Sequence, residues 1–274
     1  MAAAGAVASA ATGRITARQA IERIRKNVGV PWREQTVDTF KAGNPDTPVE
    51  GIATSFMATL DVLKRCATAG KNLLISHEPT FYNHQDATAE FTDDPVYLYK
   101  REFIEKNNMV VWRFHDHWHA RKPDAMLTGL ADVLGLAKYR MDAEGRMYAA
   151  PAAALASVAQ DFRRRVNARA MRVVGNPEME VKKMALSPGF ASLEGAVHLL
   201  RDADVLVCGE TREWEGVEYA QDAEAMGEKK GLILLGHAVS EDPGMKLCAQ
   251  WLKTFIHETP IEWIPTGEPL WRPA

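Results

Sequence analysis

Three short apolar runs in this chain each pass directly into histidines or carboxylates, and this pattern constrains the fold more than any other feature. His77 and Glu78 follow LLIS, His115 follows VVWRF, and His237 follows LILLG. Strands of a parallel sheet that is covered on both faces are continuously apolar, and ligands gather where such strands end. The sequence therefore predicts an α/β fold in which several strand ends meet at one site.

Helix and strand signals alternate along the chain from about residue 15, as expected for parallel βαβ units covered by helices. We interpret the four residues SPGF, 187–190, as a loop. Pro151 is placed at the start of a helix, because proline is favoured at the first helical position. The other predicted helices are 15–28, 58–69, 95–106, 124–135, 192–201, 215–229 and 244–256, and the predicted strands are 49–56, 72–76, 109–114, 171–174, 181–187, 203–208, 232–236 and 261–265, with a strand pair around 139–149.

The alternation is long enough for two α/β lobes with mixed, largely parallel sheets, and we expect the site between them. The first lobe is predicted to comprise residues 15–137 together with 237–274, and the second residues 138–236. Residues 1–14 are Ala-rich and are interpreted either as a disordered arm or as the remnant of an export signal. The compartment, cytoplasmic or exported, is accordingly left open.

Charge and composition narrow the possible partners. A net charge of −3 leaves no excess of basic residues to neutralise phosphates, so nucleic acid is not expected as the main partner. No apolar run approaches the roughly 20 residues that span a bilayer, so no membrane integration is expected. Three widely spaced cysteines predict buried thiols and no disulfide framework. A small-molecule substrate is the expected partner.

The residues at the strand ends are ligands suited to borderline or hard divalent cations. His77 and Glu78 are adjacent, so their side chains diverge and can reach two different ions. His237 and Glu241 are four residues apart and share one face if the chain turns helically after Gly236. With Glu241 as a bridging carboxylate and His119 as the fifth donor, the sequence predicts two divalent ions, Zn, Mn, Fe, Co or Ni, that activate a water.

Two further residues are candidates to support the ligands or to transfer protons. His115 directly follows its strand, and Glu210 follows the Gly209 turn after another buried strand. Asp116 or His117 is left open as a replacement for His119, and a hydrogen bond at a strand end is the alternative role of His115 and Glu210. The remaining histidines, His84, His198 and His257, are interpreted as structural.

The order of these motifs resembles the Nif-three-like family of dinuclear-metal-centre hexameric proteins, whose members often carry the name type 2 GTP cyclohydrolase I. The similarity rests on GIATSFMATLDVLKRCATAG, on the ligands after LLIS and VVWRF, and on SPGF, VLVCGE and GHAVSE. It implies a two-lobed α/β subunit with the metal pair in the cleft between the lobes, and a toroidal hexamer built as a trimer of dimers. The short stretch 175–181 implies that an inserted domain found in some members is absent.

Two departures from the family pattern affect the expected ligands. Members usually carry two adjacent histidines where this chain has His77 and Glu78, and a His-Thr-x-x-Asp motif where it has His115 to His119. The first change replaces an imidazole with a carboxylate, and the second does the reverse. The number of donors and their total charge are unchanged, which favours a working site with redistributed ligands.

The expected function is hydrolysis of a small molecule by a metal-bound water, with His115, Glu210 and Glu241 as catalytic candidates. The resemblance implies a cyclohydrolase or phosphoester substrate. One alternative is a non-catalytic metal-binding scaffold or regulatory assembly. Another is a metal-assisted lyase or isomerase that uses His115 or Glu210 as a base.

Overall fold

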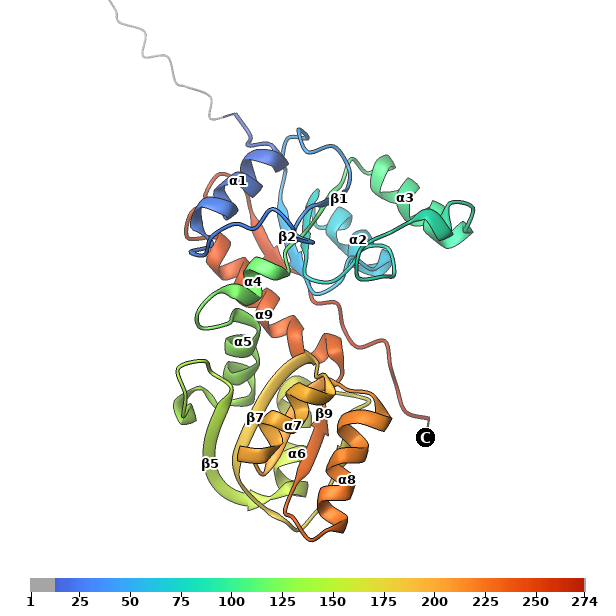
Figure 1. Ribbon diagram of the computed structural model, residues 1–274. Coiled ribbons are helices and arrows are strands. Elements are labelled where there is room, and N and C mark those ends of the chain that lie inside the picture. The colour runs from blue at the N-terminus through green and yellow to red at the C-terminus, as the bar shows by residue number, and fades with distance from the viewer. Residues whose placement is uncertain (1–12, 274) are drawn as a thin grey trace, which may run out of the picture.

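The computed structural model describes residues 13–273, which form two five-stranded sheets with helices on both faces (Figure 1). The predicted α/β fold class with mixed, largely parallel sheets is therefore confirmed. An arm or signal remnant was predicted for residues 1–14, and residues 1–12 of it lie outside the described part of the chain. Within 13–273, no helix is long and apolar enough to cross a membrane.

The first sheet carries the strands that end in the predicted ligands. Its strand order is β1-β4-β3-β2-β10, with β1 antiparallel and the others parallel. Leu73 and Ile75 pack toward α1 and α9 (His237–Leu252) on one face, whereas Leu74 packs toward α2 and α3 on the other, so all three residues are apolar. The elements are α1 Ala17–Asn27, β1 Phe40–Ala42, β2 Ile52–Ser55, α2 Leu60–Thr68, β3 Leu73–Ser76, α3 Pro95–Lys106, β4 Val110–Arg113, α4 Asp116–Ala120 and β10 Ile261–Trp263.

The second sheet has the order β5-β7-β8-β9-β6, with a parallel centre and two antiparallel edges. Helices α5 and α6 contribute to the core on one face, and α7 and α8 to the core on the other. The elements are β5 Met147–Ala154, α6 Leu155–Val166, β6 Arg172–Val174, β7 Glu180–Phe190, α7 Leu193–Asp202, β8 Val205–Glu210, α8 Glu218–Ala225 and β9 Gly231–Leu234, with short helices at η2 Ala137–Tyr139 and η3 Glu213–Val217. A further short helix, η1 Ala89–Phe91, precedes α3 beside the first sheet.

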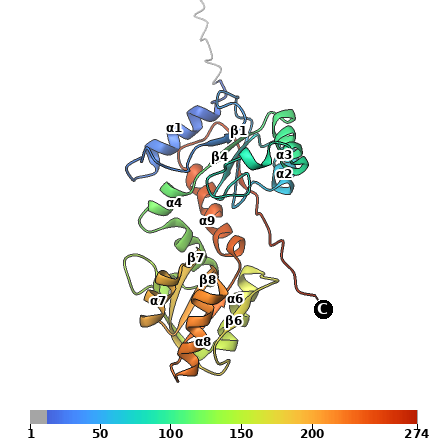
Figure 2. The same ribbon diagram turned by 45° about the vertical axis from the view of Figure 1, so that its right-hand side comes forward.

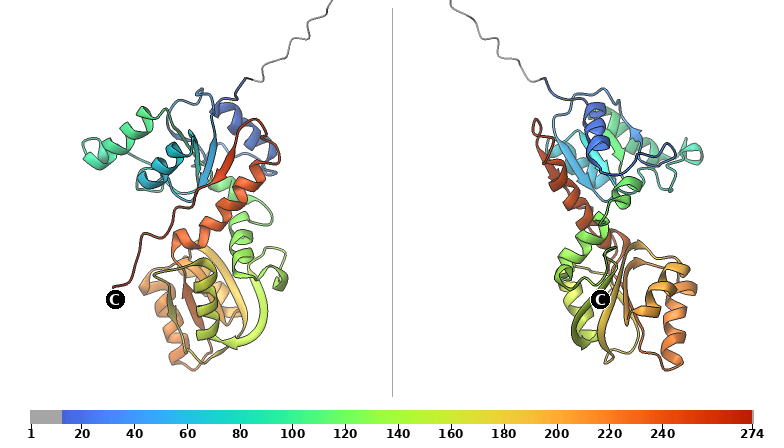
Figure 3. Two further views of the ribbon diagram at one scale, coloured as in Figure 1. Left: turned by 180° about the vertical axis from the view of Figure 1, so that it is seen from behind. Right: turned by 60° about the vertical axis from the view of Figure 1, so that its left-hand side comes forward.

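Two long-range neighbours, α5 (Ala125–Leu134) and α9 (His237–Leu252), connect the lobes (Figure 2, Figure 3). Met126 of α5 is part of the first core, while Leu130, one turn further, is part of the second. The helices cross where Gly129 meets Gly244: a Cβ on Gly129 would lie 2.6 Å from the backbone nitrogen of Gly244. This close crossing links the two lobes. The boundaries between the lobes near residues 137 and 237 stay a prediction.

Several sequence-based expectations about local structure are wrong. Pro151 lies inside β5 and opens no helix; β5 is an edge strand whose pairing is irregular between Ala149 and Ala153, a setting that tolerates proline. Residues 187–190 continue β7 past an irregularity and form no separate loop. Helix α9 begins at His237, well before 244, and accommodates Pro243 in its interior. The short β1 and α4 were not expected.

The three cysteines are free and buried, as predicted. Burial raises the pKa of Cys66 and of Cys208 to about 12, and it raises that of Cys248 as well. Because the thiolate is the reactive form, we expect no alkylation of the native protein by iodoacetamide at pH 8 and three modified thiols after unfolding. Intact-mass spectrometry measures both; fast labelling of the native protein would contradict the packing.

Candidate metal centre

Four imidazoles and two carboxylates converge between the two lobes. They come from the end of β3, from the segment that follows β4, and from the first turns of α9. Helix α9 starts directly after Gly236, whose φ of 100° favours glycine. Because His237 and Glu241 are four residues apart in this helix, their side chains lie on one face. The six side chains are His77, Glu78, His115, His119, His237 and Glu241.

Each of the four histidines uses Nδ1 on an oxygen acceptor. A ring whose Nδ1 carries the proton keeps a lone pair on Nε2, which is the form that binds a metal. All four Nε2 atoms face the other donors of the cluster. The Nδ1 partners are the Phe114 carbonyl for His77 at 3.0 Å, Asp116 for His115 at 3.0 Å, Asp124 for His119 at 3.0 Å, and Glu210 for His237 at 2.9 Å.

The distances around Glu241 are those of donors that share a cation. Ligands bound at 2.0–2.2 Å in a tetrahedral arrangement lie about 3.4 Å apart. Glu241 Oε2 lies 3.5 Å from Nε2 of His77 and 3.3 Å from Nε2 of His237. His119 Nε2 lies 3.2 Å from Nε2 of His77 and 3.8 Å from Glu241 Oε1. Glu241 thus reaches the donors on both sides of the cluster.

Glu78 faces the rings of His237 and His115. Its Oε1 lies 3.6 Å from Nε2 of His237 and 3.7 Å from Nε2 of His115. The buried Arg113 holds Oε2 at 3.1 Å, which leaves Oε1 facing the two rings. Within the described residues, two overlapping sets of donors suit an ion: His77 with His115 and His119, and His77 with Glu78 and Glu241.

The residues present fit a cation at this place. Glu241 is 3% exposed, yet its Oε2 has no hydrogen-bond partner among residues 13–273. A buried carboxylate oxygen without a partner is costly, and a metal ion removes that cost. The wall beside it is Gly189, at φ 70°, where a Cβ would lie 2.4 Å from Glu241 Oε1 and 3.0 Å from His237 Nε2. The glycine keeps this space open.

The site carries an excess of negative charge. Burial opposes the charged form of His237, but the hydrogen bond to Glu210 and the nearby carboxylates of Glu241 and Glu78 raise its pKa above the usual value. Burial, with the neighbouring rings of His119 and His115, lowers the pKa of His77 well below its usual value, which keeps that ring neutral. Carboxylates that outnumber fixed cations suit a divalent ion.

The structure separates His119 from its two alternatives. His117 is fully buried, with Nδ1 on Asp38 at 2.6 Å and Nε2 accepting from the backbone N–H of Arg33 at 2.9 Å, so both ring nitrogens are occupied. Asp116 belongs to neither donor set, whereas His119 belongs to one. Of the three possibilities, His119 is the residue that faces the cluster.

Glu210 and His115 were both candidates to support the ligands or to transfer protons, and the structure places them differently. Glu210 is not among the lining residues of the two cavities that include His237, and its carboxylate contacts His237 through Nδ1. His115 directs Nε2 into the cluster, so the geometry offers it as a sixth donor. His84, interpreted as structural, lies beside Arg113 and faces the ring of His115 at 5.5 Å between centroids.

Three supporting residues were not identified from the sequence. Asp38 accepts from the backbone N–H groups of residues 115–117 and so fixes the start of α4; no local pattern signals this contact across 77 residues or more. Asp124 was recognised only as the start of a helix. The role of Arg113 could have been predicted, because an arginine inside an apolar run is rarely buried without charged partners.

A cavity of about 440 Å³ adjoins the cluster and gives it access to small molecules. Both lobes contribute to its walls. The described lining includes the six donor residues except His77, together with His84, Asp124, Leu127, Arg146, Ser187, Pro188 and Phe190.

Replacing Asp124 with asparagine tests the support of His119. Asparagine retains the oxygen that caps α5 at Met126, but its amide nitrogen cannot accept from the Nδ1–H of His119. We expect metal affinity to fall by about 10- to 100-fold with little change in stability. Calorimetric titration of metal-free protein measures it. Asp94→Asn, at the cap of α3, is the matched control; an equal loss there would exclude a specific role.

Comparison with known proteins identifies the family. Solved structures with the same fold include a hypothetical Staphylococcus aureus protein, SA1388 (TM-score 0.73, 16% identity, 94% of this chain and 99% of that one), and a Bacillus cereus protein related to NIF3 (0.70, 13%, 94% and 99%). Reduced HcgD from Methanocaldococcus jannaschii is also similar (0.65, 16%, 91% and 97%). No curated protein matches in sequence. The family model of Duf34/NIF3 (NGG1p interacting factor 3) matches residues 27–267, and the chain therefore belongs to this family.

Proposed function

We propose that this chain is a dinuclear-metal-dependent hydrolase of a small molecule, of the cyclohydrolase or phosphoester type. The observation that carries the proposal is the buried, unpaired Oε2 of Glu241, which lies 3.3 and 3.5 Å from inward-facing nitrogens of His237 and His77. The second oxygen of the same carboxylate, Oε1, lies 3.8 Å from Nε2 of His119, so the two oxygens can each reach a different ion. Two divalent ions, of Zn, Mn, Fe, Co or Ni, are the proposed cofactors.

When bound, the ion pair supplies a water activated at neutral pH and stabilises charge on the reacting oxygens. The protein's own residues hold the donors in place. Glu210 and Asp124 fix the rings of His237 and His119 through Nδ1, and Arg113 fixes the carboxylate of Glu78. Side chains held in this way need little rearrangement when a reaction begins.

The number of donors favours catalysis over storage. A structural zinc site is typically closed by four protein ligands per ion. Closing two such sites would take more protein ligands than the four histidines and two carboxylates of this cluster provide. The six donors leave coordination positions for water or substrate, and the adjoining cavity of about 440 Å³ leads to them. A scaffold would not need such access.

We also propose a homohexamer, arranged as a trimer of dimers. The support is the resemblance of the sequence to Nif-three-like proteins. Sedimentation velocity tests it: the 30.4 kDa chain should sediment as an assembly of six, and a monomer at micromolar concentration would contradict it.

Turnover in ¹⁸O-labelled water tests the proposed reaction. Metal-free protein is reconstituted separately with each of the five metals and incubated with GTP and with a panel of phosphate esters. Hydrolysis places ¹⁸O in the product, whereas isomerisation or elimination leaves it unlabelled. Unlabelled product would assign the site to a lyase or isomerase, and no turnover with any metal would favour a metal-binding scaffold.

A further inference from the structure

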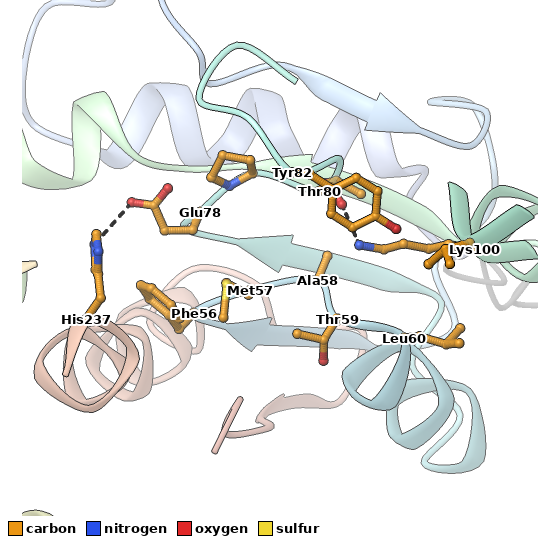
Figure 4. A pocket seen from close by; sticks show the side chains of 12 residues that line it. Phe56, Met57, Ala58, Thr59, Leu60, Glu78, Thr80, Tyr82, Lys100 and His237 are labelled. Atoms are coloured by element: carbon orange, nitrogen blue, oxygen red, sulfur yellow. Dashed lines mark hydrogen bonds and ion pairs between the residues drawn. The ribbon is translucent and has the colours of Figure 1, made fainter. Parts of the chain in front are cut away.

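A second cavity of about 440 Å³ begins at the candidate metal centre and runs along the first lobe. Glu78 and His237 lie at one end, and Lys100 of α3 lies at the other (Figure 4). We call this cavity the Lys100 pocket. Its size is that of a typical small-molecule site, and it shares two of the six donor residues with the metal centre.

The walls of the Lys100 pocket are largely apolar. They come from the segment that joins β2 to α2, from the segment after Glu78, and from the start of α3. Tyr82 is held at φ 69°, a conformation that bulky residues rarely adopt, and its side chain is 52% exposed at the pocket wall. Side chains with apolar surface that line it are Phe56, Met57, Ala58, Leu60, Tyr82 and Val96.

Lys100 is the charged group of this far end. It is 5% exposed, and its Nζ donates to the carbonyl oxygen of Thr80. Nζ also lies 5.3 Å from the ring centre of Tyr82 and 5.6 Å from that of Phe81. An ammonium has three N–H donors, and no second acceptor for them is found among residues 13–273.

Burial lowers the pKa of Lys100 to about 8, although Asp86 opposes the shift. Asp86 does not need Lys100 for its own neutralisation. Its Oδ2 lies 3.3 Å from Nζ of Lys41 and 3.7 Å from Nη1 of Arg113, and its Oδ1 accepts from the backbone N–H of Thr80. Lys100 is therefore not buried in order to form an ion pair with Asp86.

We propose that the Lys100 pocket binds the substrate of the metal centre, and that Lys100 pairs with an anionic group of that substrate. The substrate class is a small molecule with an apolar or aromatic body and a carboxylate or phosphate at one end. The body lies along the apolar wall, and the bond to be hydrolysed lies beside Glu78 and His237. The placement of the reacting bond beside Glu78 and His237 rests on the proposed function. The contact between Lys100 and the anionic group does not depend on catalysis.

Binding of a matched pair of probes tests the anion contact. We use 3-phenylpropane-1-sulfonate and the uncharged 3-phenylpropane-1-sulfonamide, because a sulfonate is a weak metal ligand. Calorimetric titration of the metal-loaded full chain should show the sulfonate binding at least about tenfold more tightly than the sulfonamide, since a charged acceptor forms a stronger hydrogen bond with a buried ammonium. Lys100→Met should abolish this preference and leave sulfonamide binding unchanged.

Arg101→Met is the matched control, because it removes the same charge from the next position of α3 and lies outside the Lys100 pocket. The preference should persist in this variant, and the metal content of all three proteins should be equal. Equal binding of the two probes by the wild type, a preference that survives in Lys100→Met, or no binding of either probe would overturn the proposal. A lack of hydrolysis with an intact preference would instead contradict the proposed function alone.

Discussion

Replacing Glu241 with alanine is expected to abolish stoichiometric metal binding. Its Oε2 lies 3.3 Å from His237 Nε2 and 3.5 Å from His77 Nε2. Its Oε1 lies 3.8 Å from His119 Nε2, so its removal weakens both proposed ion positions. Loss of a supporting residue around a metal typically costs 10- to 100-fold in affinity, and loss of a bridging ligand should cost more than about 100-fold. Elemental mass spectrometry after gel filtration measures the remaining metal.

The fold should survive this change. The variant removes a buried acidic group whose Oε2 is unpaired, which lowers the cost of burial in the metal-free protein. We therefore expect a circular dichroism spectrum like that of the wild type and an unfolding temperature at least as high as that of metal-free wild type. Glu102→Ala, at an exposed position of α3, is the control and should keep its metal. A folded Glu241→Ala protein with full metal content would refute the bridging role.

Gly129→Ala is expected to destabilise the protein, although alanine favours helices by about 1 kcal/mol over glycine. The new Cβ would lie 2.6 Å from the backbone nitrogen of Gly244 and 2.7 Å from the carbonyl carbon of Pro243, neither of which can move without shifting α9. Overpacking of this kind costs about 1–3 kcal/mol and should outweigh the helix preference. Urea denaturation should show a lower midpoint.

The same substitution in another helix separates packing from helix preference. In Gly195→Ala of α7, the new Cβ would have a single neighbour within 4 Å among residues 13–273, the side-chain oxygen of Ser192 at 3.3 Å. This variant should be as stable as the wild type or more stable, by up to about 1 kcal/mol. Equal effects of the two substitutions would mean that the crossing of α5 and α9 contributes nothing. Because α9 carries His237 and Glu241, Gly129→Ala should also weaken metal binding.

Continuous apolar runs allowed the central strands to be predicted from the sequence. Residues of β2, β3 and β4 are buried on both faces, and neighbouring residues alternate between two cores, which is why apolar residues predominate up to the last one or two positions of each strand. Helix α3 could be predicted from Asp94 and the proline that follows it, and the structure shows this aspartate capping the helix. These signals are local, and local reasoning suffices for them.

Features that depend on distant contacts were not predictable in the same way. The short β1 pairs with β4 across about 70 residues, and its three residues carry no strand pattern of their own. The last helix was predicted from residue 244 only, but α9 begins at His237 and continues through Pro243, where α5 packs closely against Gly244. Tertiary packing here overrides local preference.

The donors of the candidate site followed from strand ends and from the spacing of His237 and Glu241. The structure brings these residues together with His77, Glu78 and His119. Of the supporting acceptors, Glu210 was a candidate because it follows a buried strand, and it lies 2.9 Å from Nδ1 of His237. Asp124 did not follow, because it belongs to a different element from the ring of His119 that it orients. Their positions depend on the way α4 and α5 pack against the sheet.

Metal stoichiometry of the wild-type protein tests the central claim most directly. Metal-free protein is reconstituted with Mn, Fe, Co, Ni or Zn, passed through a desalting column and measured by elemental mass spectrometry against chain concentration. The geometry around Glu241 predicts about two ions per chain for at least one of these metals. Less than a tenth of an ion per chain with all five metals would contradict the metal centre and with it the proposed hydrolase.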